Sequence, residues 1–200
     1  MEEKQLQSEL QSIRHLMERS TKFISLSGLS GILAGCYALL GGGAAYYFTK
    51  IYSQEPDLLQ IYLNIIGILV LFSAIGTAYY LSNRNAKRAG QKVWNPASQG
   101  LFRAMAVPLL TGGLVVVILL WQQHYAFIVP SFLIFYGLSL VAGGQFTFRD
   151  FRGLGYVQIM LGLLALALPG NDLLFWLLGF GFFHLLYGSV MYFKYERRKG

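Results

Sequence analysis

The sequence predicts an all-α fold: an integral membrane bundle of six transmembrane helices with both termini in the cytoplasm. Only 12% of the 200 residues are charged, whereas soluble domains carry roughly 25%. The charges lie in short clusters between long apolar runs. Almost all Lys and Arg residues also fall in alternate connecting segments, as is typical of loops on the cytoplasmic side of a membrane. An ordinary water-soluble fold is therefore excluded.

A helix needs about 20 mainly apolar residues to cross a hydrocarbon core of about 30 Å. Six segments meet or approach this length, at residues 23–48, 61–81, 104–121, 126–146, 154–168 and 173–193. A turn over residues 122–125 separates the third span from the fourth. The fifth span ends at Pro169-Gly170-Asn171-Asp172, a run of turn-forming residues. The spans form one domain at 23–193, between an N-terminal segment at 1–22 and a basic cytoplasmic tail at 194–200.

The distribution of positive charge gives the orientation. With the N-terminus inside, Lys50 is the only one of the 16 Lys and Arg residues in an outer segment. An odd number of spans would break this alternation. The net charge of +7 is thus interpreted as cytoplasmic bias and contact with a lipid bilayer carrying anionic headgroups. The bases are divided among four segments with no recognisable nucleic-acid motif, so no nucleic-acid partner is expected.

Residues 1–22 contain an apolar stripe at helical spacing, formed by Leu6, Leu10, Ile13 and Met17. The stripe predicts an amphipathic helix, for which two interpretations are open. It lies on the inner membrane surface or folds back on the bundle, or it forms a short coiled coil with a second copy or a cytoplasmic protein.

The first span carries a continuous row of small residues, here called the glycine seam. It consists of Gly28, Gly31, Gly35, Ala38, Gly42 and Ala45, spaced alternately by three and four. Small residues let helix backbones approach closely in a membrane. The seam therefore predicts that this helix is central in the bundle or forms an oligomer interface. A shorter row, Gly181, His184 and Gly188, occurs in the last span.

His184 is the only Asp, Glu, Lys, Arg or His inside a span, and an intramembrane ionisable residue is a functional hypothesis by default. Counting 1.5 Å per residue places it near the midplane, at the depth of Tyr37, Thr111 and Tyr136. In one interpretation it is a neutral His that bonds to one of these residues and fixes helix register. In the other it senses protons or substrate in a polar cavity. Gln158 and Asn64 are expected nearer the two surfaces, bonded to neighbouring groups.

No catalytic, metal or cofactor site is predicted. A catalytic metal normally takes three protein ligands, and His15, His124 and His184 belong inside, outside and at the midplane. Cys36 is the only cysteine, which excludes an internal disulfide and a cysteine cluster. No carboxylate pair lies within the spans, so the chain is expected not to be an enzyme.

Two connecting segments carry further bases. The inner segment at 82–103, with Trp94 and Asn95-Pro96, is interpreted as a connector seated among lipid headgroups, and contact with a partner or substrate is the open alternative. The segment Arg149-Asp150-Phe151-Arg152 is interpreted as a self-paired turn.

The run Phe23-Ile24-Ser25-Leu26-Ser27-Gly28-Leu29-Ser30-Gly31, after a leader containing Met17-Glu18-Arg19-Ser20, resembles uncharacterised multi-pass proteins of bacterial inner membranes. The last two spans, with Gly162-Leu163-Leu164-Ala165-Leu166 before Pro169, look like the short hairpins of acid-resistance membrane proteins. The resemblance implies a bacterial inner-membrane location and brings no activity.

The leading hypothesis is a non-enzymatic scaffold, stress-related component or partner-binding protein of that membrane. The alternative is a small transporter or channel with His184 near the pathway.

Overall fold

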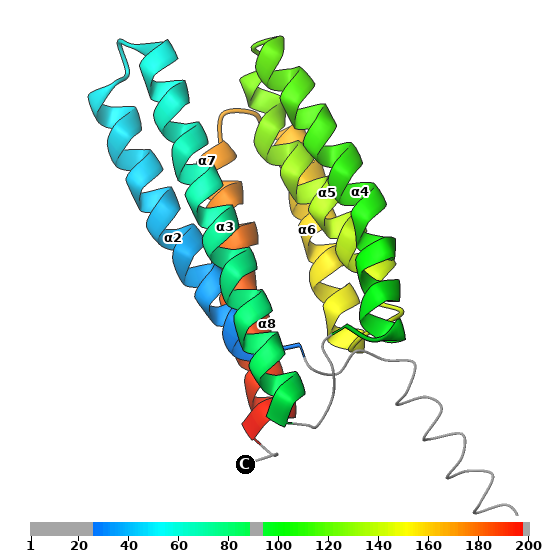
Figure 1. Ribbon diagram of the computed structural model, residues 1–200. Helices are drawn as coiled ribbons and strands as arrows, with labels where there is room; N and C mark the ends of the chain where they lie inside the picture. The colour runs from blue at the N-terminus through cyan, green and yellow to red at the C-terminus, as the bar shows by residue number, and fades with distance from the viewer. Residues whose placement is uncertain (1–25, 89–93, 198–200) are drawn as a thin grey trace, which may run out of the picture.

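Six apolar helices run side by side in the computed structural model, which describes residues 26–88 and 94–197 (Figure 1). They are α2 (Gly28–Ile51), α3 (Pro56–Arg88), α4 (Pro96–Trp121), α5 (Ile128–Gly143) preceded by η1 (Tyr125–Phe127), α6 (Arg149–Ala167), and a C-terminal helix over Asp172–Glu196. All six are long and apolar enough to cross a membrane. The all-α prediction is thus confirmed for the described residues, which contain no strand. The amphipathic helix expected at 1–22 lies outside them.

The C-terminal helix is built from four consecutive segments. They are α7 (Asp172–Trp176), the π-helical η2 (Leu177–Phe182), α8 (Phe183–Met191) and the π-helical η3 (Tyr192–Glu196). A π-helix widens the turn from four to five residues between bonded groups, and such turns are frequent at functional sites. The last span is therefore continuous but irregular.

The turns predicted at 122–125 and 169–172 are both present. Between α4 and η1, Gln123 adopts a left-handed backbone with φ 59°. Between α6 and α7, Gly170 has φ 87°, a conformation that glycine adopts without steric cost. These two residues reverse the chain at the end of the bundle opposite its basic end.

The helices extend past their apolar spans at the basic end. Helix α3 continues to Arg88 and α4 begins at Pro96, so most of the segment at 82–103 is helical where a connector was expected. Asn95 and Ser98 form a reciprocal capping box, and Pro96 occupies the first helical position. Both features stabilise a helix N-terminus, and they define where α4 starts.

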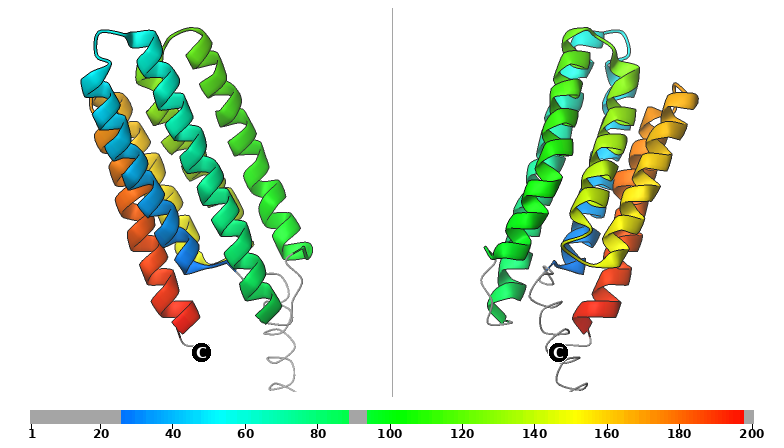
Figure 2. Two further views of the ribbon diagram at one scale, coloured as in Figure 1. Left: turned by 60° about the vertical axis from the view of Figure 1, so that its left-hand side comes forward. Right: turned by 90° about the vertical axis from the view of Figure 1, so that its right-hand side faces the viewer.

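Two groups of three helices make up the bundle, seen from other sides in Figure 2. Helices α2, α3 and the C-terminal helix form one group, and α4, α5 and α6 form the other. The C-terminal helix joins them because it packs on α2 and also touches α5 and α6. Helix α3 packs chiefly on α2, and α4 chiefly on α5. The most apolar part of α3 contains no buried residue, whereas a third of the corresponding part of α2 is buried.

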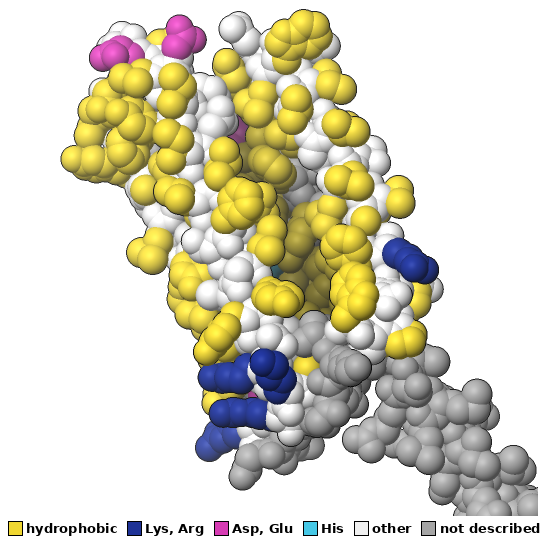
Figure 3. Space-filling view, in the orientation of Figure 1, with side chains coloured by type: hydrophobic (Ala, Val, Ile, Leu, Met, Phe, Trp, Pro, Cys, Tyr) yellow, Lys and Arg dark blue, Asp and Glu magenta, His cyan; other side chains and the backbone are white. Residues whose placement is uncertain are grey.

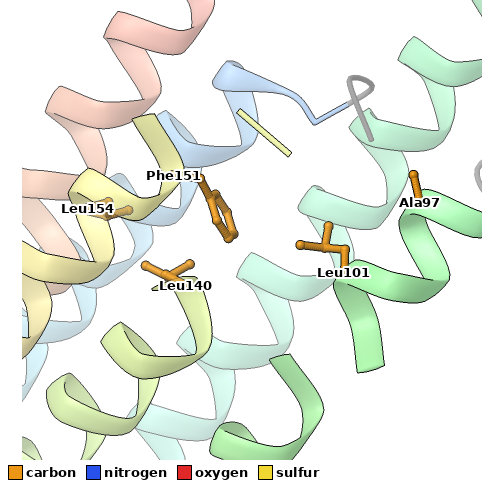
Figure 4. Packing of buried hydrophobic residues seen from close by; sticks show 5 residues of the cluster. All are labelled: Ala97, Leu101, Leu140, Phe151 and Leu154. Carbon is orange, nitrogen blue, oxygen red and sulfur yellow. The ribbon is translucent and has the colours of Figure 1, made fainter. Parts of the chain in front are cut away.

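The second group has a compact core. Ala97 and Leu101 of α4 meet Leu140 of α5 and Phe151 of α6, and the Phe151 ring points toward Leu140 and Leu101 (Figure 4). A second cluster joins α5 and α6 to the C-terminal helix through Leu133, Leu161, Ala165 and Phe175. The two clusters hold α5 and α6 in fixed positions beside the C-terminal helix.

The glycine seam of α2 faces the C-terminal helix. A Cβ atom added to Gly28 would lie 2.3 Å from the backbone nitrogen of Tyr192, and one on Gly35 would lie 2.8 Å from that of Leu185. Gly188 makes the reciprocal approach, at 2.3 Å from the nitrogen of Ile32. Further along the seam, Ala38 is buried, Gly42 lies against Leu177, and Ala45 is half-buried. The seam is therefore occupied within the chain.

Hydrogen bonds and an ion pair join the helices at the end of the bundle where the described chain begins and ends. Glu196 Oε1 accepts hydrogen bonds from the backbone nitrogen of Gly28 at 2.9 Å and from Asn85 Nδ2 at 2.8 Å. Lys194 Nζ lies 2.9 Å from Asp150 Oδ2, to which the Tyr195 hydroxyl also donates. The expectation of a self-paired turn at 149–152 is therefore wrong. That segment is the first turn of α6, and Asp150 pairs with the C-terminal helix.

Candidate polar site inside the bundle

The buried histidine and the side chains around it form the candidate site. His184 lies in the first turn of α8 and is 6% exposed. Tyr136 reaches it from α5 and Gln158 from α6, while Gly179 belongs to η2. Three separate helices therefore contribute to the site.

Both ring nitrogens of His184 are engaged. Nε2 lies 2.9 Å from the hydroxyl oxygen of Tyr136, and Nδ1 lies 2.9 Å from the carbonyl oxygen of Gly179. A carbonyl oxygen can only accept, so Nδ1 carries the proton that donates to Gly179. In the neutral ring Nε2 then accepts from the Tyr136 hydroxyl. This hydrogen-bond network assigns one neutral tautomer.

Gln158 shares the carbonyl of Gly179 with the histidine. Its Nε2 donates to that oxygen at 2.8 Å, which fixes the orientation of the side-chain amide. The 3.4 Å separation of Gln158 Nε2 from His184 Nδ1 then brings two donors together and contributes no bond. Gln158 is 0% exposed, and its Oε1 has no hydrogen-bond partner. An unpaired buried acceptor costs about 1–3 kcal/mol.

The π-helical segment explains why one carbonyl serves two side chains. Wider turns disturb the regular ladder of backbone hydrogen bonds in a helix. At Gly179 the carbonyl oxygen accepts from Gln158 and from His184, five residues further along. The absence of a side chain at Gly179 is also required, because an added Cβ would lie 2.7 Å from Gln158 Oε1. The glycine, the irregular turn and the two polar side chains thus form one structural unit.

Aromatic rings cover the histidine. The Phe180 and His184 ring centroids are 5.9 Å apart at an interplanar angle of 28°, and the Tyr136 and His184 centroids are 5.5 Å apart at 25°. Phe180 also contacts Trp176 at 4.7 Å. The imidazole therefore lies among ring faces, in a setting that favours its neutral form.

Of the residues expected near His184, the structure brings Tyr136 to it. Tyr37 is half-buried on α2 and Thr111 is exposed on α4. Within the described part of the chain, neither residue forms a hydrogen bond with His184. Gln158 was expected nearer a surface, and the structure places it against the histidine. It does bond to a neighbouring backbone group, as predicted. The signal that could have identified it is its position as the one amide in the fifth span.

The chemistry available at the site is hydrogen bonding between neutral groups. Within the described ranges no three His, Cys, Asp or Glu residues come together to hold a metal ion. A neutral imidazole between a hydroxyl and a carbonyl orients its neighbours and can exchange one proton with the phenol. The site thus joins α5, α6 and the C-terminal helix through polar contacts.

No protein-family model matches the chain, and comparisons with curated proteins and with solved structures give no match. The side chains described above are therefore the basis for a functional proposal.

Proposed function

We propose that this chain is a non-enzymatic scaffold of the bacterial inner membrane, with six spans and both ends in the cytoplasm. The observation that carries the proposal is the polar site. Both ring nitrogens of His184 bond within the chain, as expected of a histidine that fixes helix register. The exposed face of α3 and residues 1–22 are then the surfaces offered to a second copy or a cytoplasmic protein partner.

The distribution of charge at the two ends of the bundle supports the orientation. Arg84, Lys87 and Arg88 lie in the last turns of α3, at the end where Gly28 meets Glu196. Glu55 and Asp57 lie at the opposite end, at the turn between α2 and α3. The positive end belongs in the cytoplasm, by the preference of Lys and Arg for that side.

Cysteine labelling tests this topology. In a Cys36→Ser background, we expect Ser53→Cys and Gln122→Cys to react with a membrane-impermeant maleimide in intact spheroplasts, because both positions are exposed at outer turns. Gln145→Cys, exposed at the turn between α5 and α6, should react only after lysis. Labelling of Gln145→Cys in intact spheroplasts, or protection of Ser53→Cys, would contradict the proposed orientation.

A small transporter or channel is the second candidate. The observation in its favour is the π-helical segment η2 beside the buried histidine, because broken helices line the binding sites of many transporters. In this alternative, opening of η2 would expose His184 and the unpaired Gln158 oxygen to a pathway.

Reconstituted liposomes distinguish the two candidates. A scaffold whose histidine is engaged internally should give proton and solute flux no higher than that of protein-free vesicles. Robust flux that is lost in His184→Ala, with the thermal unfolding transition of the variant still present, would overturn the scaffold and establish the transporter. His124→Ala is the matched control, because His124 is exposed at an outer turn.

A further inference from the structure

The turn between α6 and α7 lies deeper in the bundle than the other two turns at the same end (Figures 1 and 2). Gly42 of α2 lies against Leu177, and α2 continues beyond Gly42 to Ile51, a further length of about 14 Å. The C-terminal helix begins at Asp172, about 8 Å before Leu177. Asp172 is therefore recessed by about 6 Å relative to the end of α2.

Helix α7 forms part of the floor of a hollow between the two helix groups. It packs on α2 of one group and on α5 of the other. The indole nitrogen of Trp176 donates to the carbonyl oxygen of Ala38 on α2 at 3.3 Å, and its ring meets that of Phe132 on α5. Figure 3 shows the hollow between α3 and α4, with apolar walls and an acidic side chain inside it near the end opposite the basic cluster.

The carboxylate of Asp172 has no positively charged partner within the described ranges. Asp172 is half-buried, and its carboxylate accepts a hydrogen bond from its own backbone amide. Lys50 is the one described base at this end, and its Nζ lies 5.4 Å from the centroid of the Tyr46 ring. Glu55 and Asp57 add negative charge at the same end. A partly desolvated carboxylate in this setting attracts a cation.

Aromatic rings line the floor next to this carboxylate. The ring centroids of Trp176 and Phe180 are 4.7 Å apart at an interplanar angle of 49°. Those of Phe132 and Trp176 are 6.4 Å apart at 77°, and Phe132 is 39% exposed. Trp176 follows Asp172 by four residues, a spacing that brings Cβ atoms to about 5–6 Å on one helix face. A group that lies on these rings is therefore also within reach of the carboxylate.

We propose that Asp172, Trp176 and Phe132 form a binding site for one lipophilic organic cation, an ammonium or phosphonium with apolar substituents. Its charge lies beside the carboxylate and within about 6 Å of the ring faces, which attract cations through their quadrupoles. Its apolar substituents lie along the walls of the hollow. A hydrated metal ion is disfavoured, because hard cations require several oxygen ligands. The site adds a ligand to the proposed scaffold and does not depend on the orientation of the chain in the membrane.

Isothermal titration calorimetry of the full-length protein in a neutral detergent tests the proposal. The probes are tetraphenylphosphonium and tetraphenylborate, which share one shape and carry opposite charges, each corrected for uptake by protein-free micelles. We expect one tetraphenylphosphonium to bind per chain, with an affinity at least about tenfold higher than that of tetraphenylborate. Equal affinities, tighter binding of tetraphenylborate or no saturable binding would overturn the proposal, and this comparison requires no variant.

A pair of charge variants locates the site. Asp172→Asn should reduce the affinity for tetraphenylphosphonium by at least about tenfold, because the charge that faces the cation is lost. Asp57→Asn is the matched control. Asp57 also lies in the first turn of a helix at this end, and it is exposed, so the affinity should stay within about twofold of the wild-type value. An equal loss in both variants would show attraction to net charge alone and overturn the site.

The contribution of the rings is tested by Phe132→Leu, which keeps an apolar side chain and removes an aromatic face. The affinity for tetraphenylphosphonium should fall by about two- to fivefold, the contribution of one exposed ring to cation binding. Phe193→Leu changes a 56% exposed ring at the opposite end of the C-terminal helix and should have no effect. An unchanged affinity in Phe132→Leu would overturn the proposed site. The labelling and flux experiments have independent results, so failure of the cation site is distinguishable from failure of the scaffold proposal.

Discussion

Gly188→Ala is expected to separate α2 from the C-terminal helix and to lower the free energy of unfolding by about 3 kcal/mol. The new Cβ would lie 2.3 Å from the backbone nitrogen of Ile32 and 2.8 Å from the carbonyl oxygen of Gly28. Both are backbone atoms, so no change of rotamer relieves the overlap. The helices must move apart, and their close contacts along the seam are lost with them. Thermal unfolding in detergent should show a midpoint lower by about 6–12 °C.

Gly43→Ala is the matched control for this substitution. Gly43 lies on α2, and an added Cβ there would meet nothing within 4 Å. The same single-carbon change should leave the unfolding midpoint unchanged or raise it, because alanine favours helix by about 1 kcal/mol over glycine. Equal destabilisation by the two variants would show that α2 presents a different face to the C-terminal helix.

The number and class of the helices could be predicted because bilayer thickness constrains composition directly. The long uncharged runs are interrupted at Gln122-Gln123 and at Pro169-Gly170. These are the places where the helices there can end. At the basic end the constraint is weaker. Polar residues there can be helical. The cap at Asn95 starts α4 at Pro96, eight residues before Ala104, where the uncharged stretch begins.

The glycine seam predicts a close backbone neighbour and does not identify it. A row of small residues on one helix has the same spacing whether the partner is a span of the same chain or a second copy. The reciprocal position of Gly188 against Ile32 is a property of three-dimensional packing. The structure places the partner within the chain, on the C-terminal helix.

The sequence predicts the depth of the candidate site along the helices, but not which helix faces meet there. Counting residues places Tyr37, Thr111 and Tyr136 at similar levels, yet depth along a helix contains no information about the face on which a side chain lies. Thr111 is exposed on α4, whereas Tyr136 points inward to His184. Gln158 was missed as a site residue because its bond to the Gly179 carbonyl accompanies the π-helical turn, and no local sequence rule predicts that turn.

His184→Ala has the second large effect that we expect, a loss of about 2–3 kcal/mol in the free energy of unfolding. The substitution leaves the Tyr136 hydroxyl without its acceptor and opens a void among the rings of Phe180 and Tyr136. The Gly179 carbonyl keeps its hydrogen bond from Gln158 Nε2, which limits the loss in the free energy of unfolding. His124→Ala changes the same residue type at an exposed turn and should leave the unfolding midpoint unchanged.

A double-mutant cycle isolates the bond between Tyr136 and His184. Tyr136→Phe removes the hydroxyl and leaves His184 Nε2 without a donor, so it too should destabilise the bundle. Because each single variant already loses the bond, the double variant should cost less than the sum of the two. A coupling of about 0.6–1.7 kcal/mol is expected for such a bond inside a membrane. Strict additivity would mean that the 2.9 Å contact between Tyr136 and His184 contributes no stability. This result would contradict the proposed role of His184 in fixing helix register.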